Sequence, residues 1–343
     1  MPTLFVCSPL EPAHVDRLRA LDPALEVVYR PDLLPPVRYA NDHKGAPIAR
    51  TGAALAAWRD GLARADILWD LPAPEDVPYA ARLRWVQATS TGVGPAVAAL
   101  DQAFARADVI VTTARGVHAR PLAEFVFMAL LAHFRGLTHL KAEQHAHRWT
   151  RYCGQEVAGR TLVLLGAGDL ARGSARIARA LDMRVVAVAR DPLRARAHGK
   201  LFDEIVPTSA LRPVLARADA LVVTVPHTPE TEGLIDAEAL SAMPRGAAVV
   251  NIGRGAVIDE PALIGALRSG AIDFAALDVA ATEPLPADSP LWDLENVLIS
   301  PHSASTVEGE NGRIVDIFAR NYAQWRAGRF DDMENVLARG RLY

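Results

Sequence analysis

The chain has 343 residues, of which 50% are hydrophobic and 22% are charged, and its 37 basic and 40 acidic side chains give a formal net charge of -3. A length well above roughly 250 residues favours two domains, and the composition excludes a disordered, collagen-like or disulfide-rich chain. The net charge is near neutral and the sequence has no basic block, so it does not predict a surface for binding nucleic acid or an anionic membrane.

Cysteine usage and the N-terminus favour a cytoplasmic protein. Cys7 and Cys153 lie far apart and neither has a CxxC partner, so the chain has too few cysteines for a zinc site or for a secreted fold held by disulfides. The N-terminus lacks the basic start and long apolar run of a signal peptide. The most apolar helical stretch, residues 122–134, is shorter than the roughly 20 residues that span a bilayer, so we expect a buried helix there.

Short apolar runs alternate with longer helical patterns along the chain, the βαβ rhythm that implies parallel sheets covered by helices. In the first part we expect strands at residues 4–7, 26–29, 67–70, 85–88 and 109–112. Between them, residues 31–50 hold four prolines, which exclude a regular helix or a central strand. We expect a surface insertion there; the alternative is a lid that carries Arg38, Tyr39 or His43.

From Ala119 a helical pattern runs towards Trp149, where we expect the first crossover between two lobes. A second series of six strands is expected at residues 161–165, 184–189, 220–225, 248–252, 274–278 and 297–300. A helix from about residue 307 to 326 follows, and residues 335–337 could return to the first lobe as an edge segment. The fold class is therefore α/β with two doubly wound parallel-sheet lobes, the first of them discontinuous in sequence.

The strand at 161–165 runs directly into GAGDLA at 166–171, a GxGxxA turn that opens a helix. Gly166 allows the tight turn, Gly168 lets the backbone approach a pyrophosphate, and the small Ala171 lets helix and strand pack closely. The anion would sit on the helix N-terminus, where free N–H groups favour negative charge. A bare GxG is more often a structural turn, but in this context the motif predicts a dinucleotide-binding Rossmann domain.

The next strand ends where such a domain usually carries an acidic residue for the adenosine ribose. Here Ala189 holds that position, followed by Arg190 and Asp191. Arg190 could pair with a 2′-phosphate through its planar fork of donors. Alternatively, Asp191 turns in to bind the ribose, or Arg190 is an ordinary solvated side chain. The sequence favours NADP as the cofactor and leaves NAD possible.

Three motifs of the second half are specific when taken together: NIGRG at 251–255, TEPLP at 282–286 and SPHSA at 300–304. On these motifs the chain, over residues 85–337, resembles the D-isomer-specific 2-hydroxyacid dehydrogenase family, of the glyoxylate/hydroxypyruvate reductase-like kind. The resemblance implies a Rossmann cofactor domain at 119–304, a flavodoxin-like substrate domain at 1–118 that the chain re-enters at 305–343, and a homodimer formed through the cofactor domains.

By this resemblance Arg254, Glu283 and His302 are the catalytic residues. Reduction of a 2-keto acid independently needs a hydride for C2, a proton donor for the keto oxygen and a cation for the substrate carboxylate, and Glu283, if hydrogen-bonded to His302, would favour the imidazolium. The nicotinamide supplies the hydride. Each residue alone would more often be a loop or turn residue, but all three follow strand ends, where open α/β sheets bind ligands.

The resemblance also implies the binding residues. Asp278 would hold the nicotinamide carboxamide, with a strand-end turn as the alternative, and His227 would contact cofactor rather than act as an acid. The expected cofactor contacts are Gly166, Ala167, Gly168, Asp169, Leu170, Arg190, Pro226, His227, Thr231, Ile252, Gly253, Arg254, Asp278 and His302. The expected substrate contacts are Thr91, Gly92, Arg254 and His302, where a plain glycine-containing turn is the alternative for the first two.

We therefore expect an NAD(P)-dependent oxidoreductase that acts on the CH–OH group of a small D-2-hydroxy acid, or reduces the matching 2-keto acid, such as glyoxylate or hydroxypyruvate. The alternatives are a non-catalytic nucleotide-sensing scaffold of corepressor type and a dehydrogenase of formate or phosphite. The retained catalytic residues disfavour the scaffold, and Glu283 disfavours the formate type, which has glutamine there. No metal site is expected, because His139, His145 and His147 form no compact ligand face.

Overall fold

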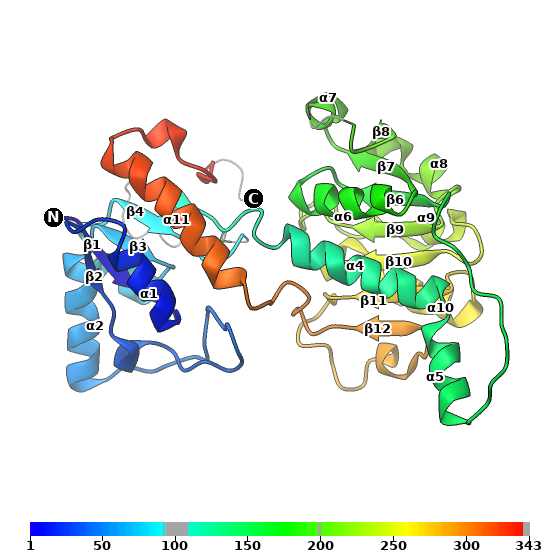
Figure 1. Ribbon diagram of the computed structural model, residues 1–343, viewed down its shortest axis with the longest axis horizontal. Helices are drawn as coiled ribbons and strands as arrows, with labels where there is room; N and C mark the ends of the chain where they lie inside the picture. Colours follow the sequence, from blue (N-terminus) through cyan, green and yellow to red (C-terminus); the bar gives the residue numbers. More distant parts are fainter. Residues whose placement is uncertain (92, 94–108, 198–199, 339–343) are drawn as a thin grey trace. The chain divides into compact units, whose positions relative to one another are not determined.

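The computed structural model describes residues 1–91, 93, 109–197 and 200–338 (Figure 1). It divides into two compact units, one formed by Met1–Val117 with Thr306–Tyr343 and the other by His118–Ser305. Each unit is built on its own parallel β-sheet with helices around it, which confirms the predicted α/β class.

The first unit contains a five-stranded parallel sheet in the order β2-β1-β3-β4-β5. Its strands, all five predicted, are β1 (Thr3–Val6), β2 (Glu26–Val28), β3 (Ile67–Trp69), β4 (Trp85–Gln87) and β5 (Ile110–Thr112). Its described helices are α1 (Pro12–Arg19), α2 (Gly52–Arg64) and α11 (Glu310–Arg326), with 3-10 turns at Pro31–Leu33, Pro74–Tyr79 and Phe330–Asp332. Val336 forms an isolated antiparallel bridge with Thr112, so the C-terminal segment returns to this unit as predicted.

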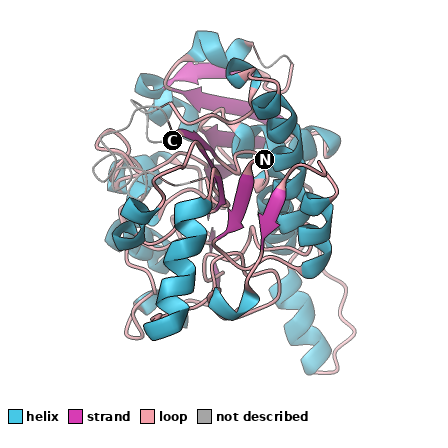
Figure 2. Cartoon of the chain, turned by 90° about the vertical axis from the view of Figure 1, so that its left-hand side faces the viewer, coloured by secondary structure: helices cyan, strands magenta, loops and turns pink. Residues whose placement is uncertain are grey.

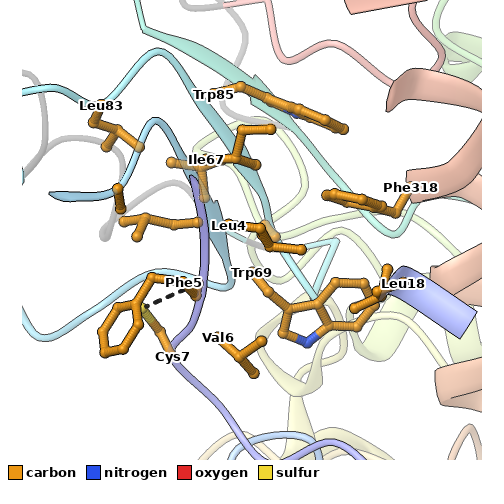
Figure 3. Packing of buried hydrophobic residues seen from close by; sticks show 14 of the residues in the cluster. Leu4, Phe5, Val6, Cys7, Leu18, Ile67, Trp69, Leu83, Trp85 and Phe318 are labelled. Carbon is orange, nitrogen blue, oxygen red and sulfur yellow. Dashed lines mark hydrogen bonds between the residues drawn. The ribbon is translucent and has the colours of Figure 1, made fainter. Parts of the chain in front are cut away.

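Aromatic side chains bind α11 to the strands of the first unit. The rings of Trp85 and Phe318 stack with their centroids 4.8 Å apart, and Trp85 Nε1 donates to Thr112 Oγ1 at 2.8 Å. Figure 3 shows Phe318 beside Trp85, and Leu18 of α1 beside Trp69. Because burial of such large rings stabilises a core, a helix from the end of the chain completes the unit that the first residues begin.

Half of segment 31–50 is exposed, and beyond the 3-10 turn at Pro31–Leu33 the segment is irregular, as its prolines predict, but it is not a loose insertion. The buried carboxylate of Asp42 accepts from Arg38 Nε at 2.8 Å, and Lys44 Nζ lies 2.8 Å from Oδ2 of the buried Asp70. Burial would raise the pKa of Asp42, but the Arg38 guanidinium and nearby backbone amides hold it well below its ordinary value. The Arg38–Asp42 pair holds the segment's own turn, and the Lys44–Asp70 pair joins the segment to the first unit.

The second unit contains a seven-stranded parallel sheet in the order β12-β11-β10-β9-β6-β7-β8. Its strands are β6 (Thr161–Leu165), β7 (Arg184–Ala189), β8 (Glu204–Pro207), β9 (Ala220–Val223), β10 (Ala248–Asn251), β11 (Phe274–Leu277) and β12 (Val297–Ile299). The sequence predicts six of them and misses β8, an edge strand with a charged first residue and a final proline, which only an edge tolerates. The strand order reverses at β6, so the GxGxxA turn lies at the topological switch point.

The described helices of this unit are α4 (Ala119–Phe134), α5 (Leu137–His145), α6 (Asp169–Ala180), α7 (Pro192–Arg196), α8 (Leu211–Leu215), α9 (Ala237–Ala242) and α10 (Glu260–Ser269). The single helix predicted from Ala119 towards Trp149 is wrong, because Gly136 adopts φ 68 and ends α4 before α5 begins. A Cβ on Gly173 of α6 would lie 2.6 Å from the Ala119 carbonyl oxygen, so α4 and α6 pack unusually closely.

None of the helices in the described part of the chain has the length and apolar character needed to cross a membrane.

Candidate active site

The three predicted catalytic residues follow three neighbouring parallel strands of the second unit. Arg254 follows β10, Glu283 follows β11 and His302 follows β12. Since the carboxyl ends of parallel strands share one edge of a sheet, the topology brings these segments together. Glu283 Oε2 and His302 Nδ1 lie 2.8 Å apart, within hydrogen-bond distance.

Glu283 uses both carboxylate oxygens. Oε1 accepts from the backbone amide of Ala280 at 3.2 Å, and Oε2 pairs with the imidazole of His302. A carboxylate accepts, so the shared hydrogen bond assigns a proton to His302 Nδ1 and leaves Nε2 outside the pair. The His302 side chain is about half-exposed, at 47%, so its imidazole can meet a ligand.

A buried aspartate shapes the turn that carries His302. His302 has φ 54, and its amide donates to the Asp278 carbonyl oxygen at 2.9 Å. Asp278 Oδ1 accepts from Ser300 Oγ at 2.7 Å and from the Ala304 amide at 2.9 Å, which ties both sides of the turn together. Burial raises the pKa of Asp278, and these two hydrogen bonds act in the opposite direction. Its predicted contact with a nicotinamide stays a prediction.

Asn251, which the sequence argument did not single out, closes the turn that presents Arg254. Its buried side chain donates to the Arg254 carbonyl oxygen and accepts from the Gly253 amide, both at 3.0 Å. Arg254 itself is exposed and donates from Nη1 to the Gly253 carbonyl oxygen at 2.7 Å. The sequence signal that could have identified Asn251 is its position, as a polar residue directly after the apolar strand residues Ala248, Val249 and Val250.

The two glycines that flank Arg254 allow close backbone contacts. A Cβ on Gly255 would lie 1.9 Å from the Ala280 carbonyl, and one on Gly253 would lie 2.7 Å from the Val225 oxygen. The Arg254 turn is therefore wedged between the loop after β9 and the loop that carries Glu283. Predicted cofactor residue Ile252, beside it, is buried.

The predicted phosphate loop has the geometry of a cradle. Gly166 adopts φ 116, and a Cβ there would lie 2.4 Å from Thr224 Oγ1, so glycine is required. Thr224, also not singled out from the sequence, donates to the Leu165 carbonyl oxygen at 2.8 Å. Gly168 is the N-cap of α6, and a Cβ there would meet no described atom within 4 Å. An open glycine backbone at the start of a long helix fits a pyrophosphate.

The other three predicted cofactor residues of this motif, Ala167, Asp169 and Leu170, lie at the start of α6. Ala167 and Leu170 are partly buried against the core of the second unit. Asp169 forms an ion pair with Arg172, one turn along α6.

The end of β7 carries Ala189 and the exposed Arg190, as the sequence indicates. The Asp191 carboxylate accepts from the Arg194 amide at 3.0 Å and so caps α7. That use of Asp191 disfavours the alternative in which it turns towards a ribose.

The loop at 226–231 is closed by Thr231. Its hydroxyl donates to the Pro226 carbonyl oxygen at 2.7 Å and accepts from the Thr228 amide at 2.8 Å. His227 Nε2 lies 3.4 Å from Glu232, and its side chain is 45% exposed. A hydrogen bond from Thr228 lowers the pKa of Glu230, and Arg190 contributes to the same shift.

The predicted substrate loop belongs to the first unit. Thr91 is exposed in a bend after β4. Gly92 lies outside the described residues.

Comparison with known proteins places the chain among dehydrogenases. A family model described as D-isomer specific 2-hydroxyacid dehydrogenase, NAD binding domain, matches residues 127–304. The D-3-phosphoglycerate dehydrogenase of Mycobacterium leprae is 34% identical over 319 residues, which cover 88% of this chain but only 59% of that protein. The glyoxylate reductase of Korarchaeum cryptofilum is 35% identical over 227 residues, covering 64% of this chain and 67% of that protein.

A crystal structure of a D-isomer specific 2-hydroxyacid dehydrogenase from Xanthobacter autotrophicus, in complex with NADPH and MES, is similar along its whole length. The TM-score is 0.74 at 29% identity, and the match covers 99% of this chain and 100% of that chain.

Substitution of Gly255 by alanine tests the backbone contact beneath Arg254. Because the added Cβ would overlap the Ala280 backbone, Gly255→Ala should lower the free energy of unfolding by about 1–3 kcal/mol, measured by urea denaturation. The control is Gly265→Ala, at an exposed position inside α10 with open space around it, which should raise stability by about 0.5–1 kcal/mol. Equal effects of the two variants would contradict the contact.

Proposed function

Since this chain belongs to the D-isomer-specific 2-hydroxyacid dehydrogenase family, we propose that it interconverts a small 2-keto acid and the D-2-hydroxy acid, with a nicotinamide cofactor as redox partner. The observation that carries the proposal is the 2.8 Å contact between His302 and Glu283, beside the strand end that presents Arg254. Glyoxylate and hydroxypyruvate are the substrates we propose, supported by the similar glyoxylate reductase.

The paired residues would divide the chemistry of reduction between them. Glu283 accepts from Nδ1 of His302, so its charge stabilises the imidazolium and Nε2 is the atom that gives a proton to the keto oxygen. Arg254 would bind the substrate carboxylate and stabilise the charge that develops on the keto oxygen. The nicotinamide, when bound, supplies the hydride. In oxidation His302 takes the proton back.

The glycine cradle at the start of α6 would hold the pyrophosphate, and we assign the second unit to the cofactor and the first unit to the substrate. For the adenosine end we propose NADP in preference to NAD, because Ala189 supplies no carboxylate and Asp191 caps α7. The NADPH bound by the similar Xanthobacter enzyme supports this choice. A cytoplasmic location remains a prediction.

Replacement of His302 by glutamine tests the acid role. Without the proton donor, kcat/KM with NADPH and glyoxylate or hydroxypyruvate should fall by about 10²- to 10⁴-fold, while NADPH binding, followed by fluorescence titration, stays close to that of the wild type. His139→Gln on the exposed helix α5 is the control and should retain turnover. Unchanged turnover in His302→Gln would remove the acid role. A wild-type protein that binds NADPH but reduces none of a panel of 2-keto acids would favour the scaffold alternative.

Replacement of Arg190 by alanine tests the choice of cofactor. The loss of a charge-assisted contact to the 2′-phosphate should weaken NADPH binding by about 10- to 100-fold and leave NADH binding nearly unchanged, both measured by titration calorimetry. Arg268→Ala, in the last turn of α10, serves as the control and should alter neither affinity. Equal losses for the two cofactors would rule out a 2′-phosphate contact.

We also propose that a second copy of this chain covers α5 and the segment after it. Helix α5 has no buried residue, and it projects from the rest of its own unit, as Figure 1 and Figure 2 show. Leu137 and Leu140 are 47% and 44% exposed, and Trp149 beyond the helix is fully exposed. Large apolar side chains left exposed on one projecting segment are typical of an interface.

Substitution on this surface should change the oligomeric state. In sedimentation velocity, the wild type should run as a dimer and Leu140→Glu as a monomer, because a carboxylate cannot be buried in an apolar interface without a partner. Leu193→Glu, at a 77% exposed position of α7, is the control and should stay dimeric. A wild-type monomer, or a dimeric Leu140→Glu variant, would contradict this interface.

A further inference from the structure

The stretch of loop that presents Glu283 has no apolar anchor of its own. Ala281, Thr282 and Glu283 are all exposed, and the apolar anchors of the loop lie on either side of them, at the buried Val279 and at Leu285, which packs against the core of the second unit. An exposed stretch between such anchors depends on polar and backbone contacts to keep one conformation. The contacts that hold this loop therefore decide where the Glu283 carboxylate stands.

On one side the loop is limited by the backbone of Gly255. The atoms that a Gly255 Cβ would overlap are the carbonyl carbon and oxygen of Ala280 at 1.9 Å and the nitrogen of Ala281 at 2.4 Å. This contact limits how closely the loop can approach the Arg254 turn. It provides no attraction that would keep the loop there.

On the other side Glu260 supplies the attraction. Its Oε2 accepts from the Ala281 amide at 3.0 Å, across 21 residues of sequence. Glu260 is the first residue of α10, a helix anchored by the buried Leu263 and Leu267. The carboxylate is therefore fixed to a packed element and holds an exposed loop two residues before Glu283.

The N-terminus of α10 does not need Glu260 as a cap. Asp259 is the N-cap, and its Oδ1 accepts from the Ala262 amide at 3.0 Å. An acid in the first turn also interacts favourably with the helix dipole, which is the competing explanation for a glutamate here. The two explanations make different predictions about His302.

We propose that Glu260 is a positioning residue, which holds the Ala281 amide so that Glu283 meets His302 at hydrogen-bond distance. The consequence for turnover rests on the function proposed above, whereas the structural contact does not. Loss of the contact should let the loop move, loosen the Glu283–His302 pair and reduce the preference of the imidazole for a proton on Nδ1.

Two variants of similar length isolate the acceptor oxygen. Glu260→Gln keeps a carbonyl oxygen that can accept from Ala281, and Glu260→Met removes it; both residues favour a helix. Glu238→Gln and Glu238→Met are the controls for the helix-dipole explanation. Glu238 is likewise an acid in the first turn of a helix, α9, whose N-cap is an aspartate.

The first measurement is ¹⁵N NMR of the His302 imidazole, assigned by its absence in His302→Gln, in full-length protein. At a pH where the ring is neutral, we expect the proton predominantly on Nδ1 in the wild type, in Glu260→Gln and in both Glu238 variants, and a clear shift towards the Nε2-protonated tautomer in Glu260→Met. The same His302 signals in Glu260→Met as in wild type would overturn the proposal. So would equal shifts in Glu260→Gln and Glu260→Met, because the acceptor oxygen would then be irrelevant.

The second measurement is steady-state turnover. Glu260→Met should lower kcat by about 10- to 100-fold with little change in KM, as for a displaced catalytic group, and Glu260→Gln should restore most of it. If wild-type protein reduces no 2-keto acid, the proposed function fails, and the NMR comparison still decides the role of Glu260. If Glu260→Met does not fold, Glu260→Ala takes its place, because alanine also lacks the acceptor oxygen and favours a helix; a His302 spectrum shifted from wild type then supports the proposal, and an unchanged spectrum contradicts it.

Discussion

The pairing of Glu283 with His302 depends on close backbone contact at the carboxyl edge of β10, β11 and β12. Parallel pairing places the three strand ends side by side, and the missing side chain of Gly255 lets two of the following loops touch. The Asp278 carboxylate then fixes the His302 turn by accepting hydrogen bonds from Ser300 Oγ and from the Ala304 amide. The imidazole is thus positioned by a rigid sheet edge, although it is itself about half-exposed.

The glycines of the sequence motifs have two physical roles. Gly168 leaves open backbone where a pyrophosphate would approach, which is the role that the motif suggests. Gly166 and Gly255 are required for another reason, since a Cβ at either position would overlap Thr224 or Ala280. Glycines in a motif that indicates ligand binding can therefore also be required by close packing between neighbouring strand ends.

Much of the fold could be predicted because its signals are local. The strands that the sequence predicts are short apolar runs, whereas β8 escaped notice because its sequence, EIVP, has a charge and a proline at its ends. The helix predicted from Ala119 towards Trp149 is interrupted after Phe134, because Gly136 adopts a left-handed conformation that the helical pattern of the sequence does not reveal. The three catalytic candidates lie in contiguous motifs and were found. Asn251 and Thr224 were not assigned a role, because they bind backbone groups: Asn251 lies inside the NIGRG motif but serves its turn, and Thr224 donates to the end of a strand 59 residues away.

The most direct test of the account is a crystal structure with NADP and oxamate, an unreactive analogue of a 2-keto acid. We expect the oxamate carboxylate on the Arg254 guanidinium, its carbonyl oxygen within hydrogen-bond distance of His302 Nε2, and the Glu283–Nδ1 contact retained. Oxamate bound away from Arg254, or a His302 ring turned from the ligand with its bond to Glu283 broken, would contradict the central claim that these strand ends form one catalytic site.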